Sequence, residues 1–451
     1  MLTGLRVYLY LAVLAGLFAS PLVGLGTLVP TLFLLMDALL IAGCSIFVLR
    51  SGRSRAGLRA GRVMRVAAVS LALVAAYGLL STAQQGGSVG DAAKYVGALS
   101  RAVLVLLAIL ALALSTRAPK AANVHRVLRR DFILLAGFQI SVATLQLLLP
   151  SVGGNFIGEF AEGQSARAAF EEGDVSGTFA NSIEFAYFLF AAYAALTLGS
   201  WRRDRSPGLV MTVLFGFFIW ASGSAAATVC FLVYSGFLIC RTWRTGTRRF
   251  VGTALGTGAC VLAYLNAGLL AELVLGKIDN MMLSRLGLLF VSVPALLERE
   301  PVRILTGFGL DFEGILAVLR SLPEVPLVFT YEGSAVVIND VFWAALLLGF
   351  GAPAMAFALW RLGGLFSAFL GADAGDAERR NLFRILIFIC LMAGMLNQIL
   401  VVRPFAVGLV LGMAPLALSA ALLRRGSPRP ARQARLAGAS PLVQVSDAPA
   451  R

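Results

Sequence analysis

Long apolar stretches, twelve by their spacing, constrain the fold of this 451-residue chain more than any other feature. Most are roughly 17 to 25 residues long, and a helix of that length crosses about 30 Å of hydrocarbon. The chain is 59% hydrophobic and 14% charged, which excludes an ordinary soluble globular protein. We therefore predict an all-α, polytopic integral membrane protein with about 12 transmembrane helices, at 5–20, 28–49, 66–84, 95–114, 132–150, 179–200, 208–221, 223–240, 251–271, 335–360, 383–401 and 405–423.

Basic residues indicate the orientation of these helices. Lys and Arg gather at 50–65, 117–130, 202–205, 241–249 and 361–380 and again from 424 onward, all on one side of a twelve-helix chain. The positive-inside rule places that side, and both termini, in the cytoplasm. The net charge of +15 then indicates topology and contact with anionic lipid headgroups, and nucleic acid is not expected as a partner.

The transmembrane domain is predicted to be single and to cover residues 1–423. It includes a large periplasmic loop at 272–334, between the ninth and tenth helices, and a disordered cytoplasmic tail follows at 424–451. Arg6 precedes the first apolar run, as in a signal peptide, but further spans follow at once and no clear small-residue cleavage site is present. We therefore expect an uncleaved first helix.

Cysteine and histidine usage indicates neither a metal site nor a cofactor. The five cysteines lie within or at the ends of the expected helices with no paired spacing, so we predict no disulfide framework. His125 is the single histidine and lies in a basic cytoplasmic loop, which removes histidine-based catalysis at the outer face.

Three outer segments are long enough to carry chemistry, at 85–94, 151–178 and 272–334. The last is about sixty residues long, and a loop of that length on a compact protein is usually functional. Within it we expect amphipathic helices at 273–289 and 312–322, lying along the membrane interface, with a turn at Gly307 and Gly309 before the second.

Four charged residues fall within or at the outer ends of expected helices: Asp37, Arg101, Glu184 and Asp340. Each would cost roughly 2.5 to 3.5 kcal/mol if it faced lipid at the bilayer centre, so a shared polar interior is expected. We interpret Asp37 as structural, and buried ion pairs that fix helix packing remain the alternative for the others. Two acids have polar or aromatic neighbours: Asn181 and Tyr187 share a helix face with Glu184, and Asn339 and Trp343 accompany Asp340.

Several outer segments, in order, resemble the O-antigen ligase and Wzy-type polysaccharide polymerase superfamily. The sequence SGTFAN at 176–181, followed by FAYF at 185–188, is similar to a G-x-F-x-N segment that opens a helix from the outer side. ASGSAA at 221–226 stands where the family has the entry to the next outer helix. The remaining similar segments are SR at 284–285, TGFG at 306–309 and ND at 339–340, so the resemblance covers about 176–352.

Two departures from the family pattern bear on activity. The Arg common in the second segment is missing, and Ile338 stands where ligases place a His. Some exopolysaccharide polymerases of the superfamily have an acid at this loop exit, which Asp340 resembles. The resemblance therefore favours a polymerase, with an O-antigen ligase as the alternative and a polysaccharide-precursor transporter as the rival from another class.

The resemblance implies a fold like that of lipid-dependent membrane glycosyltransferases (GT-C-like), in the bacterial inner membrane. It implies transfer of a glycan from polyprenyl diphosphate to a sugar hydroxyl at the outer face, without metal or other cofactors. Its partners would be the polyprenyl-diphosphate-linked oligosaccharide, a growing polysaccharide or lipid acceptor, membrane lipids, a flippase and a chain-length regulator.

Such a reaction needs cations for the diphosphate and a carboxylate near the acceptor hydroxyl. Arginine suits the first role because its planar donors bind phosphate oxygens in pairs. The candidates on the outer side are Arg285, Arg101, Arg303 and Arg403 for the diphosphate; Asp340, Glu184 and Glu332 for catalysis; and Asn181, Tyr187, Tyr331, Asn339 and Trp343 for the glycan.

Overall fold

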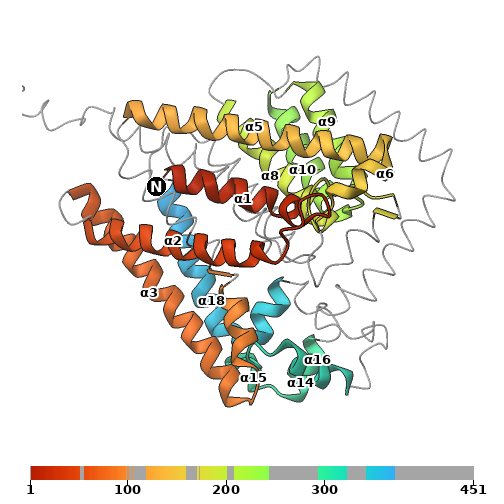
Figure 1. The fold of residues 1–451 in the computed structure, drawn as a ribbon. Helices are drawn as coiled ribbons and strands as arrows, with labels where there is room; N and C mark the ends of the chain where they lie inside the picture. Colours follow the sequence, from red (N-terminus) through yellow and green to blue (C-terminus); the bar gives the residue numbers. More distant parts are fainter. Residues whose placement is uncertain are drawn as a thin grey trace, which may run out of the picture.

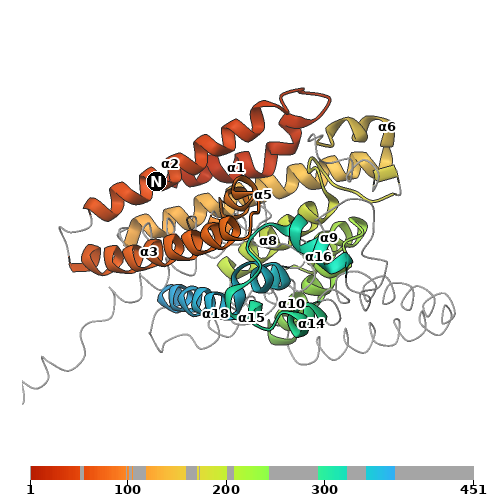
Figure 2. The same cartoon turned by 90° about the horizontal axis from the view of Figure 1, so that it is seen from below.

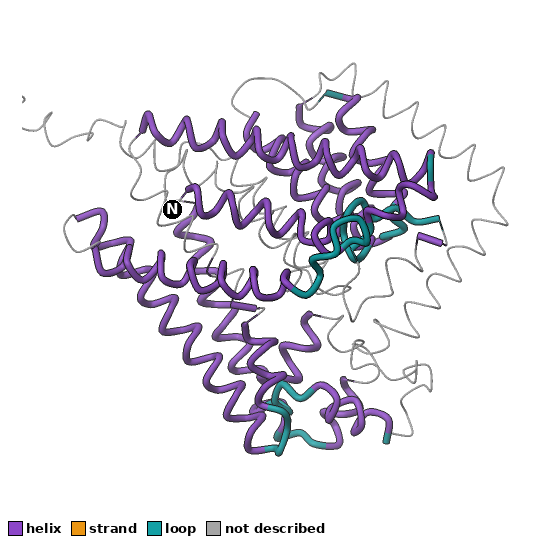
Figure 3. Tube along the Cα trace, viewed as in Figure 1, coloured by secondary structure: helices purple, strands orange, loops and turns teal. Residues whose placement is uncertain are grey.

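The structure, a computed structural model, describes residues 2–50, 55–97, 99–100, 104, 118–158, 170–171, 173–200, 208–242, 293–321 and 342–370. These residues form helices and connecting turns, and none of them lies in a strand (Figure 3). The elements are α1 (Leu2–Ala19), α2 (Leu28–Arg50), α3 (Arg55–Gln84), α5 (Ala118–Leu148), α6 (Pro150–Gly153), η2 (Gly154–Phe156), α8 (Ser182–Ser200), α9 (Leu209–Ala221), α10 (Ala225–Thr242), α14 (Val293–Arg299), α15 (Arg303–Thr306), α16 (Phe312–Arg320) and α18 (Phe342–Leu370).

The all-α prediction is confirmed for this part of the chain. Two of its helices are long and apolar enough to cross a membrane, Arg126–Leu148 within α5 and Trp343–Arg361 within α18. Shorter apolar helices of 10–17 residues occupy Thr3–Ala19, Thr31–Gly43, Ala68–Gln84, Ser182–Thr197, Leu209–Ala221 and Ala225–Leu238. The expected stretches at 251–271, 383–401 and 405–423, most of 95–114, the expected helix at 273–289 and the tail lie outside the described residues.

Two of the helices begin well before their apolar stretches. α3 starts at Arg55 and α5 at Ala118, so both extend through segments that the sequence suggests are basic loops. Arg, Lys and Ala are good helix formers, and no proline interrupts either element after its first turn. The apolar pattern thus predicts the apolar part of each helix, but not where the helix starts.

The helices pack as two groups. In the first, α8 contacts α5, α9 and α10, and every residue from Phe185 to Thr197 is buried. That helix is apolar on all sides, as expected for the centre of a bundle. In the second group, α18 contacts both α3 and α15.

Helices α1 and α2 connect the two groups (Figures 1 and 2). α1 contacts α5 on one side and α2 on the other, and α2 in turn contacts α3. The two groups are therefore linked by a continuous series of packed helices.

Polar side chains of α1 bind both of its neighbours. Arg6 forms a two-pronged ion pair with Asp131 of α5, with Nε to Oδ2 at 2.5 Å and Nη2 to Oδ1 at 2.9 Å. Tyr10 donates a further hydrogen bond to Asp131 Oδ1 at 3.2 Å, and the carboxyl of Asp131 is completely buried. On the other side, Tyr8 donates to Asp37 Oδ1 of α2 at 2.6 Å. That contact agrees with the structural role predicted for Asp37.

Close backbone packing joins the other end of α1 to the first group. A Cβ added at Gly16 would lie 1.7 Å from the carbonyl oxygen of Thr178, and one at Gly158 would lie 2.6 Å from the Cα of Gly16. Only glycine permits these approaches. The segment that precedes α8 is thus held directly against α1.

Candidate functional site

Residues 305–310, which we call the outer turn, form the best defined part of the expected periplasmic loop. Gly307 and Gly309 have φ values of 70° and 77°, in the region that L side chains rarely adopt. A Cβ at Gly307 would lie 2.7 Å from the carbonyl oxygen of Gly349, and one at Gly309 would lie 2.8 Å from the Cα of Thr82. The turn predicted at these two glycines is therefore confirmed, and both are needed for conformation and for packing.

A break in α18 provides the partner of the outer turn. Gly351 has φ 76° and ψ 164°, and Pro353 follows two residues later. Proline has no N–H and Gly351 turns the chain, so carbonyl groups just before the break lose their partners within the helix. One of them, at Leu348, accepts a hydrogen bond from the backbone N–H of Phe308 at 2.6 Å. The single helix expected at 335–360 is thus two helical pieces joined at the place where the turn binds.

The C-terminal half of α3 holds the other side of the outer turn. Thr82 Oγ1 accepts from the backbone N–H of Leu310 at 2.8 Å and donates to Gly78 O of its own helix at 2.8 Å. The hydroxyl of Tyr77 donates to Thr306 O at 2.7 Å. Side chains of α3 thus satisfy backbone groups of a non-helical segment, which is what such a segment needs away from water.

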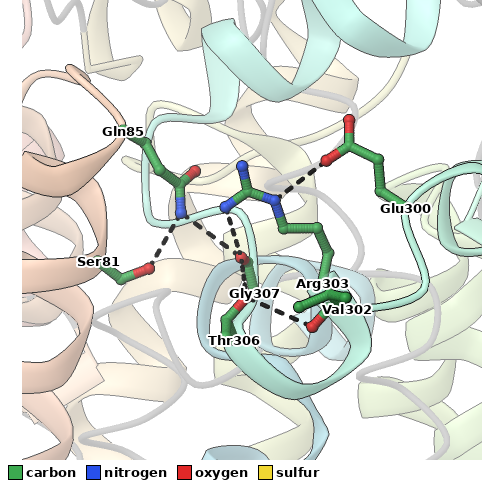
Figure 4. A network of polar contacts seen from close by, with 7 residues as sticks. All are labelled: Ser81, Gln85, Glu300, Val302, Arg303, Thr306 and Gly307. Carbon is green, nitrogen blue, oxygen red and sulfur yellow. Dashed lines mark hydrogen bonds and ion pairs between the residues drawn. The ribbon is translucent and has the colours of Figure 1, made fainter.

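Three donors converge on the carbonyl oxygen of Gly307 (Figure 4). They are Gln85 Nε2 at 3.5 Å, Arg303 Nη1 at 3.5 Å and Thr306 Oγ1 at 3.3 Å. Arg303 also pairs through Nε with Glu300 Oε2 at 3.1 Å. The arginine therefore helps to fix the turn through one long hydrogen bond to Gly307 O, while its ion pair with Glu300 orients the guanidinium.

Arg303 is the single predicted diphosphate-binding residue within the described ranges. Its guanidinium lies over the ring of Phe308, 5.2 Å from the centroid, and a third of the side chain is exposed. Among the described residues no protein atom accepts from Nη2, so that group remains available to an anion. The position is compatible with the predicted role, but its contacts give it a structural role first.

α16 begins directly after the outer turn, close to the predicted 312–322. Asp311 caps it by accepting from Gly314 N at 3.2 Å. Its apolar face packs into a cluster with Tyr95, whose ring meets that of Phe312 edge-on at 4.9 Å. The helix is amphipathic as predicted, and its apolar face is buried against protein. The expected position along the membrane interface stays a prediction. Trp343 packs against the same cluster and is partly buried.

Two glutamines of α5 hold the segment before α8. Gln146 Nε2 donates to Gly177 O at 2.7 Å, and its Oε1 accepts from the N–H groups of Ser176 at 3.1 Å and Gly177 at 2.9 Å. Gln139 acts in the same way on Thr178, with its Oε1 accepting from the N–H at 2.9 Å and its Nε2 donating to Oγ1 at 2.7 Å. Both glutamines are buried. We call this arrangement the glutamine clamp.

The clamped segment also meets the turn between α9 and α10. Val175 N donates to Ala221 O at 3.0 Å. Gly223 has φ 70°, and a Cβ there would lie 2.1 Å from Asp174 Oδ2. Two of the segments that carry the family resemblance, 176–181 and 221–226, are therefore neighbours in space.

At the start of α8, the predicted helix face is only partly present. Asn181 precedes the helix and caps it, accepting from Ile183 N at 2.8 Å through its side chain. Glu184 lies in the first turn and is partly buried, where the helix dipole favours a negative charge. Tyr187 is fully buried in the bundle, so its ring is not exposed for stacking on a sugar in this structure.

The described contacts place the candidate residues in two different groups. Glu184 belongs to the α5, α8, α9 and α10 group, whereas Arg303 and Trp343 belong to the group built on α3 and α18. The other candidates lie outside the described residues: Arg101, Arg285, Arg403, Asp340, Glu332, Tyr331 and Asn339.

One exposed pair lies on the short outer segment after α3. Lys94 Nζ donates to Asp91 Oδ1 at 2.8 Å. This hydrogen bond, assisted by Ser88, holds the pKa of the Asp91 carboxyl below its usual value. The lowered pKa makes the Asp91 carboxylate a weaker base than an unpaired aspartate.

Several residues that fix this geometry were not indicated by our reading of the sequence. Gln139 and Gln146 are seven residues apart in an otherwise apolar stretch, and that spacing alone places two amides on one helix face. Asp131 lies at the edge of a basic run and resembles a loop residue in sequence. Thr82 gives no signal, because threonine is common at any position in a membrane helix.

No group of three or more His, Cys, Asp or Glu side chains that could hold a metal ion occurs in the described part. Comparison of the chain with models of protein families, with curated proteins and with solved structures yields no match.

Proposed function

We propose that this chain is a multi-pass bacterial inner-membrane enzyme that polymerises polyprenyl-diphosphate-linked glycan repeat units at the outer face of the membrane. The observation that carries the proposal is the pairing of the segments that resemble the polymerase and ligase superfamily. Segments 176–181 and 221–226 are neighbours, and 306–309 docks on 348–351, just after the resembling loop exit. Segments far apart in sequence thus meet in two pairs, one in each helix group, which supports the proposal.

The proposed reaction is a glycosyl transfer. An acceptor hydroxyl oxygen attacks the anomeric carbon of the lipid-linked glycan, and the bond from that carbon to the diphosphate oxygen breaks. The diphosphate leaves with the electron pair, and a carboxylate takes the hydroxyl proton. The step needs no oxidant or nucleotide, because the diphosphate is a good leaving group once cations hold its charge.

The described residues supply two parts of this scheme. Arg303 is partly exposed and keeps one donor nitrogen for an anion, so we assign it to the diphosphate. Glu184 is partly buried in the first turn of α8, and we assign it to the acceptor side together with Asp340. Because Glu184 and Arg303 belong to different helix groups, catalysis through both would require the remaining candidates, Arg285 and Asp340, to lie between them.

The test is deletion of the gene and analysis of surface polysaccharide on a sizing gel. Complementation uses the wild type, Arg303→Gln, Glu184→Gln and, as a matched control, Arg299→Gln, which changes an exposed arginine four residues before Arg303. We expect the deletion to leave single repeat units, and the control to restore long chains. If Arg303→Gln and Glu184→Gln reach normal membrane levels but do not restore long chains, the roles proposed for both residues are supported.

Other outcomes favour other functions. Long chains that persist without attachment to the cell would indicate a ligase, the alternative that the outer segments also resemble. Repeat units that accumulate on the cytoplasmic side would indicate a transporter. An unchanged glycan profile would remove the family assignment altogether.

A further inference from the structure

The two ends of the outer turn meet its supporting helices at different depths. Residues 305 and 306 meet Gly351 of α18 and Tyr77 of α3, whereas 307 to 310 also meet Thr82 and Gln85 at the end of α3. The apolar part of α18 begins at Trp343, eight residues before Gly351, and that of α3 ends at Gln84, seven residues after Tyr77. At 1.5 Å per residue, both helices place residues 305 and 306 roughly 10–12 Å from these ends.

This depth matters because Trp343–Arg361 has the length of a membrane span. Its two helical pieces together hold 19 residues, about the number that spans the hydrocarbon layer, and it begins with Trp and ends with Arg, which favour the two interfaces. A segment docked 10–12 Å along this span lies within the outer leaflet and not above it.

Non-helical backbone is tolerated at membrane depth only where protein satisfies its polar groups. Four backbone groups of the outer turn meet this condition. Tyr77 donates to the carbonyl at 306, Gln85 and Arg303 donate to the one at 307, and Thr82 accepts from the N–H at 310. The N–H at 308 donates to Leu348 O at the break in α18.

Three apolar side chains in and just before α15 face outward, next to the polar Arg303 and Thr306 of the same helix. Val302 is 68% exposed and Leu305 is 61% exposed, and Ile304 is exposed as well. On α3, Leu73 and Leu80 flank Tyr77 on one helix face and are likewise exposed. Tyr77 binds the end of α15, so the outward apolar surface of α3 continues onto α15.

We propose that α15, with Val302 and Leu305 at its surface, is embedded in the outer leaflet and contacts lipid acyl chains. Polar residues stand immediately before it: Glu298 and Arg299 are exposed, and Glu300 pairs with Arg303. The chain therefore passes from charged to apolar side chains within three residues, as expected for a segment that crosses the interface. The guanidinium of Arg303 extends back toward Gln85 near the end of α3, away from the apolar tip (Figure 4).

This inference rests on the membrane placement proposed above but on no catalytic activity. It also assigns the lipid contact to a different element from the one the sequence suggests. α16 has the stronger amphipathic pattern, but its apolar face packs against the protein. The short α15 has no pattern that can be read from four residues.

The test places a nitroxide label on single cysteines in the full chain, with the five native cysteines replaced, in phospholipid nanodiscs. Labels at Leu305→Cys and Val302→Cys are compared with Leu73→Cys on α3, as the lipid-facing reference, and with Glu298→Cys, as the aqueous reference. Collision rates with oxygen, which concentrates in lipid, and with a water-soluble nickel chelate are measured at each position. All four native side chains are exposed, so the labels replace no packed group.

We expect the ratio of oxygen to nickel collisions at 305 and 302 to match that at 73 and to exceed that at 298 several-fold. A ratio at 305 and 302 like that at 298, with a lipid-like value at 73, would overturn this inference and leave the membrane placement intact. Low collision rates with both reagents would also overturn it, because they would indicate cover by protein. A water-like ratio at 73 itself would overturn the membrane placement, and the proposed function with it.

Discussion

The glutamine clamp leads to a quantitative prediction for Gln146→Met. Methionine has a similar length and volume, so the substitution leaves little cavity and removes only the amide. Three backbone groups of the clamped segment then lose their partners, because Gln146 makes bonds of 2.7, 2.9 and 3.1 Å to them. All three lie in a buried region where water cannot replace the amide.

The expected loss of stability follows from these three bonds. Hydrogen bonds between membrane helices contribute about 0.6 kcal/mol each on average, which sets a lower value of roughly 2 kcal/mol. A buried group left without a partner costs about 2 kcal/mol, which sets an upper value of roughly 6 kcal/mol for three. We expect the free energy of unfolding to fall within this range.

The assay is equilibrium unfolding of the purified protein in mixed micelles, followed by circular dichroism. Thr144→Val serves as the matched control, since Thr144 lies on the same helix and its hydroxyl bonds only to Ile140 O of that helix. A loss for Gln146→Met that equals the loss for the control, within about 0.5 kcal/mol, would refute the reasoning.

A second substitution at the same position tests the cause. In Gln146→Glu the protonated carboxyl can still accept through one oxygen and donate through the other, whereas the ionised form is a buried charge with no donor. We therefore expect this variant to be more stable at acidic pH, where the carboxyl is protonated, than at neutral pH.

Three further predictions concern α1 and the outer turn. Gly16→Ala should destabilise the fold by more than about 3 kcal/mol, because its Cβ would overlap a backbone carbonyl, whereas Gly4→Ala on the same helix has open space and should change thermal stability little. Arg6→Ala should cost about 3–5 kcal/mol in unfolding experiments by leaving the buried carboxylate of Asp131 without its cation, and equal stability would contradict the pairing. Tyr77→Phe removes the hydroxyl that binds the outer turn and should lower the local stability of 302–310 by roughly 1–1.5 kcal/mol, which speeds amide hydrogen exchange there by about tenfold. Unchanged exchange would argue against that contact.

Local signals in the sequence predicted the outer turn and the helix after it. Gly307 and Gly309 lie two residues apart beside an apolar pattern, and the structure places them in the left-handed region before α16. The break in α18 also has a local signal in the sequence, because Pro353 lies inside the apolar stretch and follows Gly351. Hydropathy alone, however, does not distinguish a broken helix from a continuous one.

Contacts between distant segments were not predictable from the sequence in the same way. The partner of Asp131 is 125 residues away, and nothing around either residue indicates the other. The interpretation of Asn181 also changed. This residue directly precedes α8 and caps it, so it does not lie on the helix face where it was expected. The expected roles of Arg285 and Asp340 stay predictions, since both lie outside the described residues.

The ion pair between Arg6 and Asp131 has a consequence for the order of assembly. Ribosomes add about 5–20 residues per second, so the 125 residues between the two side chains take roughly 6–25 s to synthesise. During that interval α1 is already made but lacks the carboxylate that neutralises its arginine, and the segment that packs on Gly16 has not yet emerged. Helix α1 thus reaches its final place only after segments made much later have emerged. Quality control during biogenesis would meet α1 with an unpaired charge until α5 arrives.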